Sequence, residues 1–442
     1  MPNDVAAFAD PGPRLVQVMN AERQELAKCL FEKFREMSFD GVGISRETYG
    51  PGETAAMQIV EAVGQAHGFE TRWDAAQNLI LALPGKDPGL PVVASGSHLD
   101  SVPQGGNFDG AAGVIASLMA MLAANHSAPL LRTLELYVLR GEESAWYGGP
   151  CYFGSRALFG QLSESDFSSR HRLTGDSLAT NMERAGVAMN LVRGQLPLVD
   201  VGHFHSWMEL HIEQGPVLIA QDKPIGIVTG IRGNVRHRRV VCRGQAAHSG
   251  AVPRWLRHDA VLAMSELLMR IDEHWRVLLE WGEDLVVTAG IVETNSQEHA
   301  VSRVPGEVFF SLEYRSQDTK TLKSFGDLIR SECEQLEAKL GVTFDVGVPV
   351  YTEPARMSDR LVEFAQSAAD KAKIECEIMP SGAGHDSAVF ANAGVPSTMV
   401  FVRNQNGSHN PHEAMELEDF FAGAEVLSQS LLSAADMIDE VQ

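Results

Sequence analysis

The sequence has few cysteines, no long apolar run and no pattern typical of a secretory leader at its start, and each shortage narrows the kind of protein that we expect. Its five cysteines stand apart and form no CxxC pair, which argues against thiolate metal sites and favours a reducing compartment. No stretch of about 18 apolar residues exists that could span a membrane. The first residues lack a basic segment followed by an apolar one, so we expect a cytoplasmic protein without membrane contact.

Basic residues are also in deficit. Lys and Arg number 36 against 58 Asp and Glu, a net charge of −22 with His neutral. Such a protein repels phosphate backbones and anionic membranes, which makes nucleic acid an unsuitable partner. Most of this acidity serves solubility, but some carboxylates remain available to hold cations.

Several familiar catalytic motifs are missing as well. The chain contains no GxSxG elbow, no GxGxxG, no P-loop and no HExxH helix. Catalysis by a nucleophilic Ser or Cys is therefore poorly supported.

What is present is an alternation of strand and helix patterns over 442 residues, enough for two or three domains. Residues 91–100 and 133–143 each predict a strand that ends in polar residues, and 15–37, 111–124, 359–372 and 418–438 predict helices. Apolar strands between helices indicate an α/β fold with a mostly parallel central sheet. In such sheets, functional sites form at the carboxyl ends of the strands.

A middle segment has its own order of elements. Strands are predicted at 225–243, 285–293, 307–315 and 343–351, and helices at 259–276 and 321–340. This is a β-α-β-β-α-β, or split βαβ, unit. We therefore predict an inserted domain at 222–352 within a discontinuous domain formed by 1–221 and 353–442.

The first polar group, GSHLDSVPQGGNFDG, follows a predicted strand and supplies His98, Asp100 and Asp109. A metal-bound His is usually oriented by a carboxylate behind it, a role that suits Asp100. A polar loop with an Asx turn at 107–110 is the alternative.

The next two groups also follow strands. GEES contains Glu142 and Glu143, and if they continue the strand they point to opposite sides, so that one can bind a metal while the other faces substrate. In ELHIEQGPVL, His211 and Glu213 would share one strand face, with Gln214 on the other. A solvated acidic loop and an ordinary turn are the alternatives.

Two further groups lie near the C-terminus: SGAGHDSAVFA with His385 and Asp386, and NGSHNPHEAM with His409, His412 and Glu413. Each also fits a turn or a helix cap. Together the five groups offer imidazoles and carboxylates but no thiolate, a set that suits Zn²⁺, Mn²⁺, Co²⁺ or Ni²⁺. A bridging carboxylate would fit two ions about 3.5–4 Å apart, which lower the pKa of a bound water towards 7.

In this order, these motifs resemble those of the dinuclear-metal amidases, the family of N-carbamoyl-L-amino-acid hydrolases, β-ureidopropionases, and allantoate and ureidoglycolate amidohydrolases. The resemblance extends from about Asn20 to the end of the chain. It implies a zinc-peptidase-like catalytic domain with an inserted α+β lid and dimerisation domain, and hence a homodimer.

The resemblance also implies roles for individual residues. Two divalent ions, Zn²⁺ in the first instance, would be bridged by Asp109, and Glu142 would be the general acid/base that takes a proton from the bridging water. The expected metal ligands are His98, Asp109, Glu143, His211 and His409. The expected substrate contacts are Gln214, His248, Ser302, Arg315, Gly384 and His385.

Two of these contacts have a defined chemical task. His248, in QAAHSG, would stabilise the negative charge that develops on the attacked carbonyl oxygen, within one subunit or across two. Arg315, in LEYRS, would grip a substrate carboxylate in a bidentate manner, with a structural ion pair as the alternative.

The sequence departs from the family pattern at two places. Ser302 stands where the family usually carries an Asn that helps hold the substrate, and SAWYGG, with Trp146 and Tyr147, replaces the usual glycine-arginine-phenylalanine segment. Since the expected ligands and Glu142 are intact, these departures bear on the substrate more than on the chemistry.

The resulting prediction is metal-dependent hydrolysis of a linear C–N amide bond, first of all of an N-carbamoyl-L-amino acid to the amino acid, CO₂ and ammonia. The alternatives are an allantoate or ureidoglycolate amidohydrolase, an N-acyl amino acid deacylase or dipeptidase, and a catalytically silent ligand-binding protein with the same fold.

Overall fold

The computed structural model describes residues 18–127 and 129–437. The start of the helix predicted at 15–37 and the last residue of the one predicted at 418–438 lie outside them. The chain divides into two compact units: unit 1 is Met1–Thr229, Met357–Met379 and His385–Gln442, and unit 2 is Gly230–Arg356 and Pro380–Gly384. The main segment of unit 2, Gly230–Arg356, begins eight residues later and ends four residues later than the insertion predicted at 222–352.

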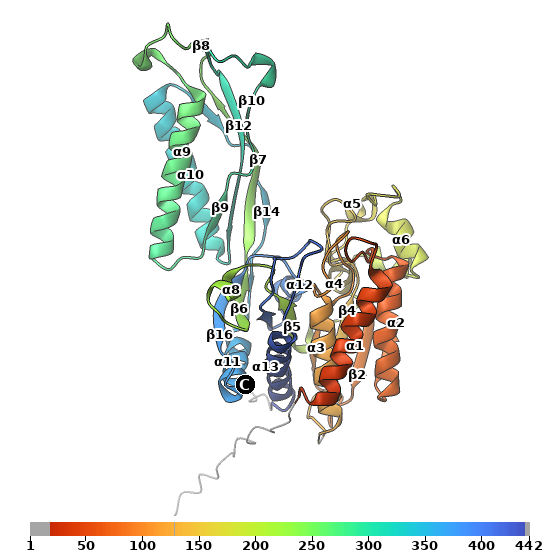
Figure 1. The fold of residues 1–442 in the computed structure, drawn as a ribbon. Helices are drawn as coiled ribbons and strands as arrows, with labels where there is room; N and C mark the ends of the chain where they lie inside the picture. Colours follow the sequence, from red (N-terminus) through yellow and green to blue (C-terminus); the bar gives the residue numbers. More distant parts are fainter. Residues whose placement is uncertain (1–17, 128, 438–442) are drawn as a thin grey trace, which may run out of the picture. The chain divides into compact units, whose positions relative to one another are not determined.

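Unit 1 is built on a mixed sheet in the strand order β1-β2-β4-β3-β5-β17-β6, with β16 also paired to β6 (Figure 1). The four central strands β4, β3, β5 and β17 run parallel, and the outer pairs are antiparallel. The strands are β1 (Glu70–Trp73), β2 (Leu79–Leu83), β3 (Val92–His98), β4 (Leu134–Leu139), β5 (Phe204–Ile212), β6 (Ile225–Ile231), β16 (Cys376–Ser381) and β17 (Ser397–Val402).

Helices pack on both faces of this sheet, so its four central strands are buried along nearly their whole length. Leu136 and Val138 of β4 join the core under α1, α2, α3 and α13, whereas Tyr137 and Leu139 pack against α4 and α12 on the other face. This alternation is the two-residue period of a strand. The helices of unit 1 are α1 (Ala21–Ser38), α2 (Pro51–Ala66), α3 (Ala111–Asn125), α4 (Phe153–Leu158), α5 (Glu164–Phe167), α6 (Leu178–Arg184), α7 (Met189–Val192), α8 (Val217–Ala220), α11 (Asp359–Ala372), α12 (Asp386–Asn392) and α13 (Leu417–Ala435).

Unit 2 is an antiparallel sheet in the order β10-β12-β7-β13, with β14 also on β7 and β9 also on β12. Helices α9 and α10 share one hydrophobic core with this sheet. The elements are β7 (Gly233–Arg243), β8 (Ala247–His248), α9 (Ala260–Glu280), β9 (Val286–Thr288), β10 (Val292–Thr294), β11 (Arg303–Val304), β12 (Glu307–Ser316), α10 (Thr319–Leu340), β13 (Thr343–Asp345), β14 (Val350–Thr352) and β15 (Ala355–Arg356).

Three strand predictions were wrong in one respect, because each joins two strands into one. Residues 225–243 form β6 and β7, which belong to different sheets, and 285–293 covers β9 and the start of β10. Residues 343–351 are interrupted at Gly347, whose φ of 61° ends an extended strand. Hydrophobic alternation alone does not reveal such breaks.

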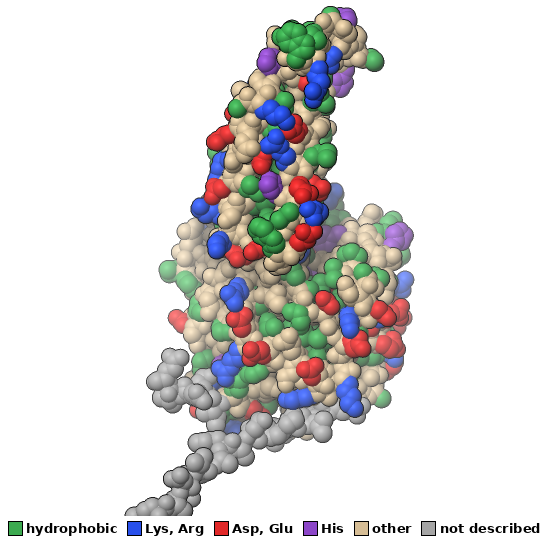
Figure 2. All heavy atoms as spheres, turned by 90° about the vertical axis from the view of Figure 1, so that its left-hand side faces the viewer, with side chains coloured by type: hydrophobic (Ala, Val, Ile, Leu, Met, Phe, Trp, Pro, Cys, Tyr) green, Lys and Arg blue, Asp and Glu red, His purple; other side chains and the backbone are tan. Residues whose placement is uncertain are grey.

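The outer face of α9 and α10 carries charges of both signs (Figure 2), and many of them are paired. Arg270, for example, lies 2.6 Å from Glu332 and 2.7 Å from Glu266. Among the described residues, no helix is both long and apolar enough to cross a membrane.

Candidate metal centre

The polar groups meet because the four parallel strands of unit 1 end at one edge of the sheet. His98 is the last residue of β3, Glu142 and Glu143 follow β4, His211 is next to last in β5, and His409 follows β17. In a parallel sheet these carboxyl ends lie side by side, which brings distant segments to one place.

Three buried side chains form the first candidate metal group: His98, Asp109 and His211. Asp109 Oδ1 lies 3.5 Å from His98 Nε2 and 3.2 Å from His211 Nε2. Gly110 makes this packing possible, because its φ is 66° and a Cβ there would lie 2.5 Å from the His98 ring.

Asp109 also belongs to the second candidate group, with Glu143 and His409. His409 Nε2 lies 3.6 Å from Asp109 Oδ2 and 3.6 Å from Glu143 Oε2. Within each group the ligand atoms lie within 4.8 Å of one another. Asp109 thus offers one oxygen to each group, the arrangement expected of a carboxylate between two ions.

Two of the candidate ligand atoms lack a hydrogen-bond partner within the protein, which suits atoms that bind a metal ion. His98 Nε2 and Glu143 Oε1 are buried and make no hydrogen bond, although unsatisfied buried polar atoms are costly. Burial raises the pKa of Glu143 well above its ordinary value, and the Asp109 carboxylate raises it further. A divalent cation would supply the missing partner and the missing positive charge, so the residues present fit two such ions.

Asp100 organises the residues behind both groups. Its Oδ1 lies 3.1 Å from His98 Nδ1 and accepts the Glu142 backbone N–H at 3.1 Å. Its Oδ2 accepts the Glu143 N–H at 3.2 Å and the Thr48 hydroxyl at 2.5 Å. One buried carboxylate therefore orients a histidine and fixes the loop that carries both glutamates.

The strand argument for Glu142 and Glu143 was wrong, because β4 already ends at Leu139. It is the two hydrogen bonds to Asp100, not a strand period, that set the direction of this loop. Glu142 Oε2 lies 3.8 Å from His98 Nε2. Burial raises the pKa of the Glu142 carboxyl well above its ordinary value, against the lowering effect of His98.

The same applies to Glu213 and Gln214, because β5 ends at Ile212. Glu213 accepts the backbone N–H groups of Val217 and Leu218 at 2.7 and 2.8 Å, so it caps α8. It does not lie on one strand face with His211 and belongs to neither candidate metal group. Gln214, with a φ of 62°, turns back and donates its side-chain amide to Asp109 Oδ2 at 2.7 Å.

Ser408 and Glu413 also contribute to this centre. Glu413 was noted as a member of the last polar group, but no role in the site was predicted for either residue. The Ser408 hydroxyl contacts Asp109 Oδ2 at 2.5 Å and Glu413 Oε2 at 2.6 Å, and Glu413 Oε1 accepts the Phe108 and Asp109 N–H groups. Burial, and next the Asp109 charge, raise the pKa of Glu413 to about 7. Both lie in the NGSHNPHE motif, whose clustering was the available signal.

His385 joins the centre from the glycine loop. It is buried, and its ring lies 4.4 Å from the His211 ring, centroid to centroid. Burial lowers the pKa of His385 well below its ordinary value, and the charge of His211 lowers it further. Asp386 accepts a hydrogen bond from Ser155, and Gly384 is an exposed residue of unit 2.

The other predicted substrate contacts belong to unit 2. His248 is exposed, and its Nδ1 accepts the N–H groups of Gly250 and Ala251 at 3.2 Å. The neutral ring therefore carries its proton on Nε2, which can donate. Arg315 pairs with Glu313 at 3.0 Å and donates to Gly382 O at 3.1 Å, so the structural ion pair considered above does exist.

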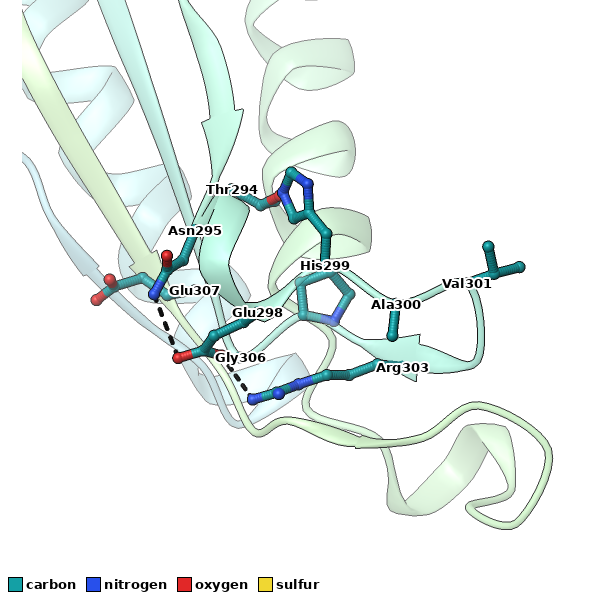
Figure 3. Close-up of a pocket in the computed structure, with 10 residues that line it drawn as sticks. Thr294, Asn295, Glu298, His299, Ala300, Val301, Arg303, Gly306 and Glu307 are labelled. Carbon is teal, nitrogen blue, oxygen red and sulfur yellow. Dashed lines mark hydrogen bonds and ion pairs between the residues drawn. The ribbon is translucent and has the colours of Figure 1, made fainter.

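Ser302 is exposed and lies in a loop that borders a cavity of about 560 Å³ within unit 2 (Figure 3). Glu298 lies between Asn295 and Arg303 at the wall of this cavity, and His299 contacts Thr294 at 2.7 Å. Arg303, which lines the cavity, pairs in register with His248 and follows Ser302 in the chain. The predicted substrate contacts His248 and Ser302 therefore both lie near this cavity.

A protein-family comparison now adds to this geometry. Residues 94–433 match the model of peptidase family M20/M25/M40, which is more than half of the chain. The chain belongs to this family. This match, together with the similar proteins described next, confirms three expectations: the family, its α/β fold and a hydrolase of the amidase/carbamoylase type.

Individual members of the family are similar over nearly the whole length. Allantoate amidohydrolase of Escherichia coli (strain K12) is 32% identical, over 89% of this chain and 93% of its own. N-carbamoyl-L-amino-acid amidohydrolase of Paenarthrobacter aurescens is 32% identical over 93% and 97%. The crystal structure of an amidase of the hydantoinase/carbamoylase family from Burkholderia multivorans is 28% identical, with a TM-score of 0.81 over 93% and 98% of the two chains.

Proposed function

We propose that this M20-family hydrolase cleaves an N-carbamoyl-L-amino acid to the amino acid, CO₂ and ammonia, with two divalent ions, Zn²⁺ first, held by His98, Asp109, Glu143, His211 and His409. The observation that carries the proposal is the pair of side-chain groups that share Asp109. Its relatives include enzymes named for N-carbamoyl-L-amino acids and for allantoate.

The bound ions would supply an activated water and polarise the attacked carbonyl. Glu142 is the proton carrier in this proposal, because its carboxyl lies buried beside the first group and burial raises its pKa above the ordinary value of a glutamate. It would accept the proton of the attacking water and deliver it to the departing nitrogen. Asp100 keeps Glu142 in place through its backbone N–H.

Substrate recognition in this proposal falls to unit 2, the lid and dimerisation domain. His248 Nε2–H would donate to the oxygen that gains negative charge, a task that suits its tautomer. Arg315 would bind the substrate carboxylate with the guanidinium N–H groups that Glu313 and Gly382 leave open. Gln214, Gly384 and His385 would line the substrate site, and a homodimer formed through unit 2 is part of the proposal.

Ser302 is the residue that the proposal leaves least constrained. A serine is shorter than the asparagine usual in this family, so it leaves room for, or loses a contact to, the substrate. Allantoate or ureidoglycolate, which also present ureido groups and a carboxylate, are therefore the second candidates, and N-acyl amino acids the third.

A substrate panel tests the assignment. The protein is loaded with Zn²⁺, Mn²⁺, Co²⁺ or Ni²⁺ and offered N-carbamoyl-L-amino acids, allantoate, ureidoglycolate and N-acetyl amino acids. Ammonia released with an equal amount of amino acid supports the carbamoyl assignment. Acetate without ammonia would replace it with a deacylase, and no turnover on any of them would leave a binding protein.

Glu142→Gln tests the proton carrier directly. We expect kcat to fall by roughly 10²–10⁴-fold, the usual contribution of general acid–base catalysis. The metal content should remain two ions per chain, because Glu142 is in neither candidate group. A variant with unchanged kcat would disprove the role of Glu142.

A further inference from the structure

A second cavity lies in unit 1, apart from the metal centre. It has a volume of about 480 Å³, in the range of small-molecule sites, and the segments 47–58 and 171–185 line it. None of the five side chains of the two metal groups is part of its lining. The hydrolytic site therefore does not account for this cavity.

Trp146 and Tyr147, which belong to one of the two segments that depart from the family pattern, lie behind the wall of this cavity. The Trp146 ring stacks on the His171 ring, with 5.3 Å between centroids and 5° between planes. Tyr147 contacts the same imidazole edge-on at 5.4 Å, and its hydroxyl accepts a hydrogen bond from Asn181 at 2.7 Å. His171 and Asn181 both line the cavity. The SAWYGG segment thus fixes two residues of the cavity wall.

His171 has an unused hydrogen-bond donor at this wall. Its side chain is 1% exposed, and its Nδ1 accepts the Thr174 backbone N–H at 3.3 Å, which leaves the ring proton on Nε2. Nε2 is buried and makes no hydrogen bond, and Glu47, which also lines the cavity, is 3.9 Å away. A buried donor without an acceptor is costly unless a ligand or water completes it.

The charges of the wall favour a ligand with both signs of charge. Glu47 and Asp176 provide two carboxylates, of which Asp176 is paired with Arg184 at 2.6 Å. Among the described residues, His171 and Glu47 do not take part in a group close enough to hold a metal ion. The ligand should thus be an organic molecule that bridges the wall: an ammonium group facing Glu47, and an acceptor facing His171 and Arg184.

We propose that this cavity binds a small zwitterion, an α-amino acid in its simplest form, and that binding alters turnover at the metal centre. Two hydrogen bonds connect the sites. Thr48, in the cavity lining, donates to Asp100, and Trp146, stacked on His171, donates its indole N–H to Ser101 O at 2.6 Å. The first of these hydrogen bonds ends on the carboxylate that holds Glu142 and Glu143, and the second ends on the residue that follows Asp100 in the chain.

The test is calorimetric titration of the metal-loaded protein with glycine and L-alanine, next to methylamine and acetate as probes of one charge each. The variants are Glu47→Gln and Arg184→Gln, neither of which belongs to the catalytic centre. Glu183→Gln is the matched control, since Glu183 is exposed, adjacent to Arg184 in the chain and absent from the lining. The titration uses no hydrolysable substrate, so it does not depend on the substrate assigned above.

We expect an amino acid to bind at least tenfold more tightly than methylamine or acetate, and each cavity variant to weaken that binding at least tenfold, whereas Glu183→Gln leaves it unchanged. We also expect the amino acid to change kcat in the wild type but not in the cavity variants. No binding at millimolar amino acid, or binding that both cavity variants retain, would overturn the proposal. Binding that leaves kcat unchanged would overturn its second part.

Discussion

Asp100 accepts a hydrogen bond from the backbone N–H of Glu142 at 3.1 Å, although 42 residues separate them in the chain. The same carboxylate oxygen lies 3.1 Å from His98 Nδ1. The residue that orients a proposed metal ligand is therefore also the one that positions the proposed proton carrier, which connects metal affinity to catalysis in this protein.

The first prediction concerns this connection. Asp100→Asn should weaken binding of divalent ions by about 10–100-fold, the usual cost of losing a carboxylate behind a metal-bound His. The Asn side chain has a single oxygen, so it cannot replace both carboxylate oxygens, and the loop that carries Glu142 and Glu143 loses one of its two hydrogen bonds to residue 100. Metal titration measures the effect, and Thr48→Val, which removes only one donor to Asp100, should weaken binding less. Equal affinity in Asp100→Asn and wild type would contradict the role.

The second prediction concerns metal stoichiometry. Asp109 is the one residue common to both candidate groups, so Asp109→Ala should lower the metal content from two ions per chain to none. His98→Ala and His409→Ala each affect one group and should leave about one ion. Elemental analysis after dialysis measures this, and His203→Ala, at a histidine paired with Glu135, is the control. Two ions in Asp109→Ala would reject the shared carboxylate.

The third prediction separates Glu213 from the metal site. Because Glu213 caps α8 through the Val217 and Leu218 N–H groups, Glu213→Ala should cost about 1–2 kcal/mol of unfolding free energy and leave the metal content unchanged. Urea unfolding and elemental analysis are the two measurements. A loss of metal without a loss of stability would instead make Glu213 a ligand.

The fourth prediction is a pH dependence of the metal-free protein. Burial raises the pKa of Glu413 and of Asp386 to about 7, from ordinary values of 4.5 and 3.8. A carboxyl with a higher pKa in the folded state stabilises the fold fully at acid pH, and that stability is lost as the pH rises from about 4 to about 7. The ionisation of these two carboxyls should therefore lower the melting temperature of the metal-free protein as the pH rises across this range.

Glu413→Gln isolates this contribution, since glutamine does not titrate. The melting temperature of the metal-free variant should fall less steeply with pH than that of the wild type. Added Zn²⁺ or Mn²⁺ should remove most of the difference, because bound cations stabilise the ionised carboxylates nearby. Parallel pH profiles of variant and wild type would show that Glu413 ionises as an exposed carboxyl does.

Much of the site could be predicted because its residues occur in short motifs whose order is characteristic of the family. His98, Asp109, Glu143, His211 and His409 come from four separate motifs, and the structure brings all five together. The roles of Glu213, Ser408 and Glu413 could not be read in this way. They depend on where β5 ends and on which backbone N–H groups lie within reach, and a hydrophobic pattern contains neither.

The sequence by itself determined the alternation of strands and helices, the chemistry of the available ligands and the family, since these follow from residue types, periodicity and motif order. Only the tertiary structure decided that Ser408 and Glu413 contact Asp109, that Asp100 holds the Glu142–Glu143 loop and that Trp146 and Tyr147 support His171. Such relationships join segments tens to hundreds of residues apart, and they arise when parallel strands end at one edge of a sheet and their loops pack together.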